Sequence, residues 1–210
     1  MEPADLGRAV DMAVARYSKD RPRKVLSSFT GSASHYYDMA TNMSSWVRGF
    51  SVIEKIDYPA PDLTGDEEPD WREGRDFEVY LSATDTEYLY FPVHEPGTAE
   101  TVRVWYSAPH THTDSTDTVY AGDIEAVRDL ATSFVCEMLA TRAAGSRDSG
   151  ISADSVNYRD SQLRYTQEAK AWLEKYRLGL GLPADGSAPG VSTVWFIPSE
   201  RQRRDKWLLH

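Results

Sequence analysis

The chain has 210 residues, of which 40% are hydrophobic and 27% are charged, and its formal net charge is −10. This length suffices for a domain with its own hydrophobic core, and the composition argues against wholesale disorder. The single cysteine, Cys136, excludes an internal disulfide and a multi-cysteine zinc site. No apolar stretch approaches the roughly 18 residues of a membrane span, and the acidic N-terminus lacks the pattern of a secretion signal.

Three segments have apolar residues at helical spacing, and we expect helices over residues 4–18, 123–144 and 155–178. Cys136 lies within the second segment, where a buried structural thiol is expected rather than a reactive one. The third segment has an aromatic face, which indicates contact with another subunit. The subunit-interface candidates on this face are Tyr158, Tyr165, Trp172 and Tyr176.

Between the first and second helices, residues 24–108 contain six short runs rich in Val, Ile, Tyr, Phe and Trp, which is typical of strands. The last run, TVRVWYSA, puts Val102, Val104 and Tyr106 on one face. Residues 57–78 carry a net charge of −7, from nine acidic and two basic side chains, and predict a solvated loop. The pattern predicts an α+β fold.

The C-terminal end differs from the rest of the chain in composition and charge. Residues 183–190, PADGSAPG, have the composition of a linker, and a strand-like run and a basic end follow them. Residues 1–200 carry a net charge of −13, whereas residues 201–210 carry +3. Because an isolated strand cannot bury itself, we expect residues 191–209 to form an arm that binds an acidic partner, such as another copy of the chain. The alternative is a tail folded back on its own β region.

The arm contains apolar anchors and cationic side chains, which predict strand addition and ion pairing with a partner. The anchors are Val194, Trp195, Phe196 and Trp207, and the cations are Arg201, Arg203 and Arg204.

The sequence contains no nucleophile motif and no phosphate-binding loop, so we expect no enzymatic activity and no cofactor. One cluster has a metal-like composition, namely His110 and His112 with the acidic residues that follow them. On a strand, this spacing would direct both imidazoles to one face, but a third ligand is not evident. The same segment also fits a polar loop that leads into the second helix, and we favour that interpretation.

Three stretches of the chain resemble the head–tail connector (adaptor or neck) proteins of long-tailed double-stranded DNA bacteriophages. They are AVDMAVARYSKDRPRKVLSSFTG at 9–31, WVRGFSVIEKIDYPA at 46–60 and SADSVNYRDSQLRYTQEAKAWLEKYRLGLG at 152–181. The start of the last stretch, DSVNYR, is the most specific of these signatures. The acidic segment and the residues after 183 depart from the family pattern.

The resemblance implies a ring, usually of twelve copies, that binds the portal of the filled capsid and a downstream neck or tail-completion protein. It places the protein in the virion neck, after assembly in the host cytoplasm, with no membrane contact. It implies a bundle-like helical core of residues 1–20 and 122–181, a β-rich insertion at 21–121, and a linker and arm at 182–210. The portal is then a second candidate partner for the arm.

The negative charge of residues 1–200, which we call the acidic body, suits a conduit through which DNA passes without specific binding. Such a surface repels the phosphates and does not neutralise them. We therefore expect part of the acidic segment to line or rim the channel. The candidates are Asp66, Glu67, Glu68 and Asp70.

Three other functions remain as alternatives at this stage. Another neck protein, such as a stopper or tail-completion protein, would be shorter and mostly β, so the paired long helices argue against it. A small metal-dependent enzyme or regulator would use His110 and His112. An adaptor for cellular partners would use the acidic segment.

Overall fold

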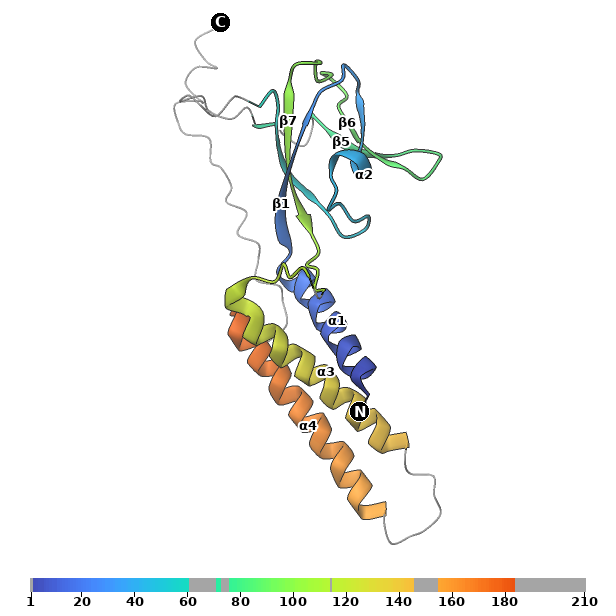
Figure 1. Ribbon diagram of the computed structural model, residues 1–210, viewed down its shortest axis with the longest axis vertical. Coiled ribbons are helices and arrows are strands. Elements are labelled where there is room, and N and C mark those ends of the chain that lie inside the picture. The colour runs from blue at the N-terminus through green and yellow to red at the C-terminus, as the bar shows by residue number, and fades with distance from the viewer. Residues whose placement is uncertain (1, 61–70, 73–75, 114, 146–154, 184–210) are drawn as a thin grey trace, which may run out of the picture. The chain divides into compact units, whose positions relative to one another are not determined.

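The protein is described by a computed structural model that covers residues 2–60, 71–72, 76–113, 115–145 and 155–183. The described residues form both helices and strands, which confirms the α+β class (Figure 1). Contacts within the chain divide it into two compact units, residues 1–121 and residues 122–210. We call them the β-rich unit and the helical unit.

The β-rich unit begins with a helix and continues with seven strands and one short helix among its described residues. In chain order these are α1 (Pro3–Asp20), β1 (Arg23–Thr30), β2 (Tyr36–Asp38), α2 (Met39–Asn42), β3 (Ile53–Asp57), β4 (Trp71–Arg72), β5 (Glu78–Leu81), β6 (Glu87–Tyr90) and β7 (Thr101–Ala108). The helix predicted over residues 4–18 is confirmed. It begins at Pro3, where a missing N–H costs nothing, and ends before Pro22, which disfavours helical geometry at the preceding residue.

The strands form two antiparallel sheets. The first has four strands in the order β1-β7-β3-β4, and β1 pairs with β7 over the full eight residues of each strand. The second has three strands in the order β2-β6-β5, and β5 and β6 form a hairpin. Both sheets combine strands that lie far apart in the sequence.

Two sequence expectations in this region were wrong in detail. The acidic segment 57–78 is not one loop, because β4 pairs with the end of β3, with Ile56 opposite Arg72. The second of the six strand-like runs, HYYDMA at residues 35–40, is not a strand throughout, because α2 begins at Met39. The cause is local, since the carboxylate of Asp38 accepts hydrogen bonds from the backbone N–H groups of Ala40 and Thr41 and so caps the helix.

The two sheets share one hydrophobic core. The predicted inward face of β7 is confirmed, because Val102, Val104 and Tyr106 are each 0% exposed. Side chains from both sheets and from α2 complete the cluster, namely Tyr37, Met39, Met43, Ile56, Tyr58, Leu89, Phe91 and Ala108.

A close approach of two backbone segments occurs at Gly31, just after β1. A Cβ atom at this position would lie 2.6 Å from the carbonyl oxygen of Pro96 and would also meet that of Gly97. The N–H of Gly31 donates to the carbonyl oxygen of Glu100 over 2.8 Å. Glycine is therefore required here by space and not by a turn conformation.

The helical unit contains a short 3-10 turn at Ala121–Asp123, α3 (Ile124–Gly145) and α4 (Ser155–Leu180), which confirms the two predicted long helices. The two helices lie side by side (Figure 1). Small residues line their seam, and the hydroxyl of Ser133 donates to the carbonyl oxygen of Ala169 over 2.8 Å. The buried side chains of α3 are Ala126, Val127, Leu130, Ser133, Cys136 and Ala140.

The contacts assign α1 to the β-rich unit and the other two long helices to the helical unit. The common three-helix core of residues 1–20 and 122–181 therefore stays a prediction. Cys136 is 6% exposed, as expected of a structural thiol.

Candidate interaction surfaces

The outer face of the β2-β6-β5 sheet carries four tyrosines in mutual contact. Successive residues of a strand point to opposite faces, so the burial of Tyr37 and Leu89 in the core directs their neighbours outward. We define the tyrosine face as Tyr36, Tyr80, Tyr88 and Tyr90. The rings of Tyr36 and Tyr90 stack with centroids 4.7 Å apart, and Tyr36 also contacts Tyr80 and Tyr88 edge-on at 5.7 and 6.2 Å.

This aromatic cluster is accessible to a partner. Tyr36 is 47% exposed and Tyr80 is 48% exposed, although both rings are large and apolar. Neighbouring tyrosines fix one another's orientation by offset and edge-to-face packing, so a partner would meet a preformed surface. A tyrosine ring offers an apolar face for stacking and a hydroxyl for hydrogen bonding.

Strand β5 adds an open edge to the same surface. Among the described strands it pairs with β6 alone, and its four residues are all exposed. Val79 and Leu81, which point away from the tyrosine face, are each 47% exposed. We call this strand the β5 edge. Edge strands of this kind, apolar on both faces and without lysine or proline, are templates for pairing with another strand.

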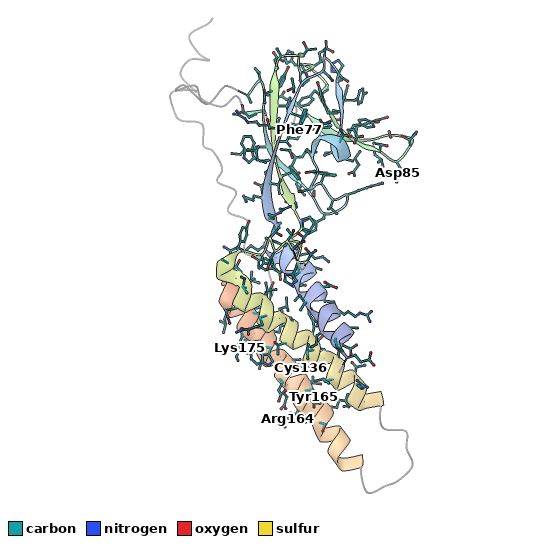
Figure 2. All side chains as sticks on the ribbon, viewed as in Figure 1. Phe77, Asp85, Cys136, Arg164, Tyr165 and Lys175 are labelled. Atoms are coloured by element: carbon teal, nitrogen blue, oxygen red, sulfur yellow. The ribbon has the colours of Figure 1, made fainter. Side chains whose placement is uncertain are left out.

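The surroundings of the tyrosine face are acidic. The eleven residues of β2, β5 and β6 include Asp38, Glu78 and Glu87 but no lysine or arginine. Asp85 lies at the tip of the β5–β6 hairpin (Figure 2). It binds Arg48 over 2.6 Å, and its hydrogen bond and charge raise the pKa of Arg48, which also lies 3.5 Å from Glu87.

An open cavity of about 610 Å³ in the β-rich unit lies beside the loop that follows β6. Its polar groups are used within the protein. The Nδ1 of His35 lies 2.6 Å from the carbonyl oxygen of Phe91, and the carboxylate of Glu100 accepts from Tyr58 Oη and Gly97 N. In the part of the chain that the structure covers, no three His, Cys, Asp or Glu side chains are arranged to hold a metal ion.

The structure separates the two histidines of the predicted metal-like cluster. His110 is 5% exposed and packs between the rings of Tyr17 and Tyr120. Its Nδ1 lies 2.6 Å from the carbonyl oxygen of Thr118 and its Nε2 lies 3.0 Å from that of Arg21, so neither nitrogen is directed at a metal. His112 is exposed, and its Nδ1 lies 3.4 Å from the carboxylate of Asp117.

This arrangement gives His110 a structural role. Its backbone N–H donates a hydrogen bond to the hydroxyl oxygen of Ser18, in α1, over 2.9 Å. His110 thus ties the end of α1 to the segment at 118–120. The polar-loop interpretation of the segment between β7 and α3 agrees with this geometry.

The subunit-interface candidates of α4 have different environments. Tyr165 and Trp172 are partly exposed, and the ammonium of Lys175 lies 3.7 Å from the centre of the Trp172 ring (Figure 2). Tyr176 is 1% exposed, so it offers almost no surface to a neighbour. The side chain of Tyr158 lies outside the described residues.

The other sequence candidates also lie outside the described residues. These are the channel-rim acids Asp66, Glu67, Glu68 and Asp70, and the arm residues Val194, Trp195, Phe196, Arg201, Arg203, Arg204 and Trp207.

The tyrosine face is absent from the sequence-based expectations, although the sequence contains a signal for it. The runs HYYD, EVYL and EYLY all contain tyrosine, and EYLY has it at every second position. The alternation predicts one tyrosine-bearing face per strand, but it does not reveal that these strands are neighbours.

The chain matches no protein-family model, no curated protein and no solved structure. Among its described helices, none is both long and apolar enough to span a bilayer.

Proposed function

We propose that the protein is a structural connector of a bacteriophage virion. Copies of the chain form a ring, of about twelve subunits by family resemblance, that joins the capsid portal to the next neck or tail component and continues the DNA channel. The three stretches at 9–31, 46–60 and 152–181 support this proposal through their resemblance to connector proteins. No catalytic role is part of it.

The observation that carries the proposal is that one chain has two different surfaces with exposed apolar groups. The β-rich unit exposes the tyrosine face and the β5 edge. The helical unit leaves large apolar side chains such as Phe134 and Leu139 only partly buried, and Leu163 is 58% exposed. A ring built by head-to-tail contacts requires two different patches on each subunit.

The alternatives receive less support from the described residues. The paired long helices favour a connector over a shorter, mostly β neck protein. A metal-dependent enzyme at His110 and His112 is disfavoured, because both ring nitrogens of His110 face backbone carbonyl oxygens.

Electron microscopy of the full chain mixed with portal complexes tests the proposal directly. The expected result is a ring of subunits on one end of the portal, with a closed rotational symmetry. A protein that is monomeric alone remains compatible with the proposal, because such rings can assemble on a template. If the full chain binds no portal complex from a panel of long-tailed phages, the proposal is overturned.

The proposed conduit role of the acidic body has its own test. Charge reversal of the acidic residues within 66–70 introduces a DNA-binding patch if these residues face the channel. We expect slower DNA ejection from assembled particles, because the new basic side chains attract the phosphates. Normal retention and ejection would show that the segment is away from the DNA path.

The arm has a deletion test. Removal of residues 184–210 should abolish the joining of connectors to DNA-filled heads, because the arm supplies apolar and cationic anchors. Normal joining by the truncated chain would show that the arm is dispensable.

A further inference from the structure

We propose that residues 191–207 of a neighbouring copy dock on the β5 edge and lie across the tyrosine face. The segment would add a strand beside β5, with its arginines over the tyrosines and the acidic groups around them. This inference deepens the proposed function, on which it rests for the identity of the neighbour as a ring subunit. It assigns the arm to a specific receiving surface.

The first argument is the backbone of β5. A strand at the edge of a sheet leaves the N–H and C=O groups of alternate residues without partners from the sheet. Among the described strands nothing pairs with the outer side of β5. An added strand would satisfy these groups, and main-chain hydrogen bonds would supply affinity without requiring a particular sequence.

The second argument is the pattern of apolar side chains. Val79 and Leu81 are about half exposed on one face of β5, and Tyr80 is about half exposed on the other. A docked strand must therefore be apolar on both of its faces. The segment VSTVWFI at 191–197 meets this condition, because Val194 and Phe196 alternate with Trp195 and Ile197.

The third argument is charge. The strands of the receiving sheet contain three acidic residues and no lysine or arginine, whereas residues 201–207 contain four basic residues and one acidic residue. Guanidinium groups stack on tyrosine rings and pair with carboxylates, so the tyrosine face and Glu78 suit the arginines of the arm.

Charge also discriminates between the open edges of the two sheets. The outer edge of the four-stranded sheet is β1, whose exposed residue Leu26 resembles those of β5. That strand begins with Arg23 and Lys24, so it would repel a basic segment. The other end of the same sheet, β4, has only two described residues, and β2, the other end of the three-stranded sheet, has three. The β5 edge is therefore the better acceptor.

The length of chain between the last described residue and the docking segment allows an exchange between copies. Seven residues, 184–190, separate Pro183 from Val191, and seven extended residues span about 25 Å. If the arm of one copy binds the β5 edge and tyrosine face of the next copy, the two copies use different surfaces. Such a contact is heterologous, and it can repeat around a ring.

Cysteine crosslinking of the full chain tests this docking. All variants carry Cys136→Ala to remove the native thiol. One protein carries Tyr80→Cys and a second, tagged protein carries Val194→Cys, so a disulfide between them can only join two copies. The matched control replaces Tyr80→Cys by Leu26→Cys, on the other open edge and of similar exposure (51%).

We expect the Tyr80→Cys protein to form the mixed disulfide several-fold faster than the Leu26→Cys control. Equal rates for the two edges would overturn the inference. So would crosslinking that occurs only within one chain, in a variant that carries both Tyr80→Cys and Val194→Cys, because this outcome assigns the arm to its own subunit.

A charge exchange provides a second measurement that does not depend on the cysteine at position 80. For this experiment the reporter cysteine moves to Leu81. Glu78→Arg should slow crosslinking by about twofold to fivefold, and adding Arg201→Glu to the arm should restore the rate. Glu174→Arg, an exposed change on α4, is the control and should have no effect. A loss that the arm change does not rescue contradicts the proposed pairing.

Imaging on the portal separates this inference from the proposed function. Crosslinking between copies without a portal-bound ring would support the docking and contradict the connector function. A portal-bound ring whose subunits do not crosslink through the β5 edge would support the function and overturn the docking.

Discussion

The β-rich unit and the helical unit bury their large side chains to different degrees. Among the described residues, the largest side chains exposed by less than 2% come mostly from the β-rich unit, including Ile56, Phe91 and Tyr106. Only Leu130 and Tyr176 come from the helical unit. Two sheets that share a core can enclose it, whereas a pair of helices has only one shared face. The comparison indicates that the β-rich unit is stabilised internally and that the helical unit depends on further contacts.

The largest expected effect is the loss of an aromatic ring from the core of the β-rich unit. Phe91 is 1% exposed and contacts the rings of Tyr37 and Tyr58, so Phe91→Ala should lower the free energy of unfolding by about 3–5 kcal/mol. Urea denaturation followed by tryptophan fluorescence measures this change in the free energy of unfolding. Val93→Ala, at a position 62% exposed, is the control and should change stability by less than about 0.5 kcal/mol. Similar losses for both variants would show that the core around Phe91 does not stabilise the β-rich unit more than its surface does.

A smaller loss is expected from overpacking the seam of the helical unit. Ala169 is 4% exposed and its carbonyl oxygen accepts from Ser133, so Ala169→Leu forces α3 and α4 apart and should cost about 1–3 kcal/mol. The measurement is thermal unfolding followed by circular dichroism at 222 nm, which reports helix. Ala171→Leu, two residues along and exposed, is the matched control. If the two variants unfold alike, the seam is not tightly packed.

A pH dependence should reveal the burial of Cys136 in the same seam. Burial raises the pKa of this thiol, and the charge of Glu168 raises it further. The unfolded chain therefore releases the thiol proton first, so the stability that the thiol contributes is complete below its ordinary pKa of about 8.5 and is lost above it. Between about pH 8 and pH 10, the free energy of unfolding should fall more steeply for the native chain than for Cys136→Ala. Equal slopes in the two proteins would show that the thiol is accessible.

The smallest effect is expected at an exposed ion pair on α4. Arg164 binds Glu168 over 2.9 Å, with 78% of the Arg164 side chain exposed (Figure 2). Arg164→Ala should therefore reduce stability by about 0.5 kcal/mol or less in denaturation curves. A loss above about 1 kcal/mol would indicate that this surface is covered by another copy in solution.

Local sequence patterns predicted the helices and strands. The features that could not be predicted depend on contacts between residues that lie far apart in the sequence. The alternation in TVRVWYSA and the apolar repeats of the long helices depend on neighbouring residues only, so β7, α3 and α4 were predictable. The burial of His110 was not, because Tyr17 and Arg21 lie about 90 residues earlier in the chain. The same holds for the pairing of β4 with β3 across the acidic segment.

The tyrosine face illustrates the same limit for a candidate site. Tyr36 stands opposite Tyr90 in the pairing of β2 with β6, but 53 residues separate them in the sequence. Only the sheet order brings the cluster together. The capping of α2 by Asp38 is a different case, since its cause is local and a cap signal was present in the sequence.

The close approach at Gly31 supplies a criterion for recognising distant relatives of this chain. A protein may replace most core residues by others of similar volume and keep its fold. No side chain fits at position 31, however, because the carbonyl oxygens of Pro96 and Gly97 occupy the space of its Cβ. A remote relative with this fold should therefore have a glycine after its first strand. It should also have a turn like Pro96-Gly97 followed by an acceptor like Glu100, even where the overall identity is too low to align.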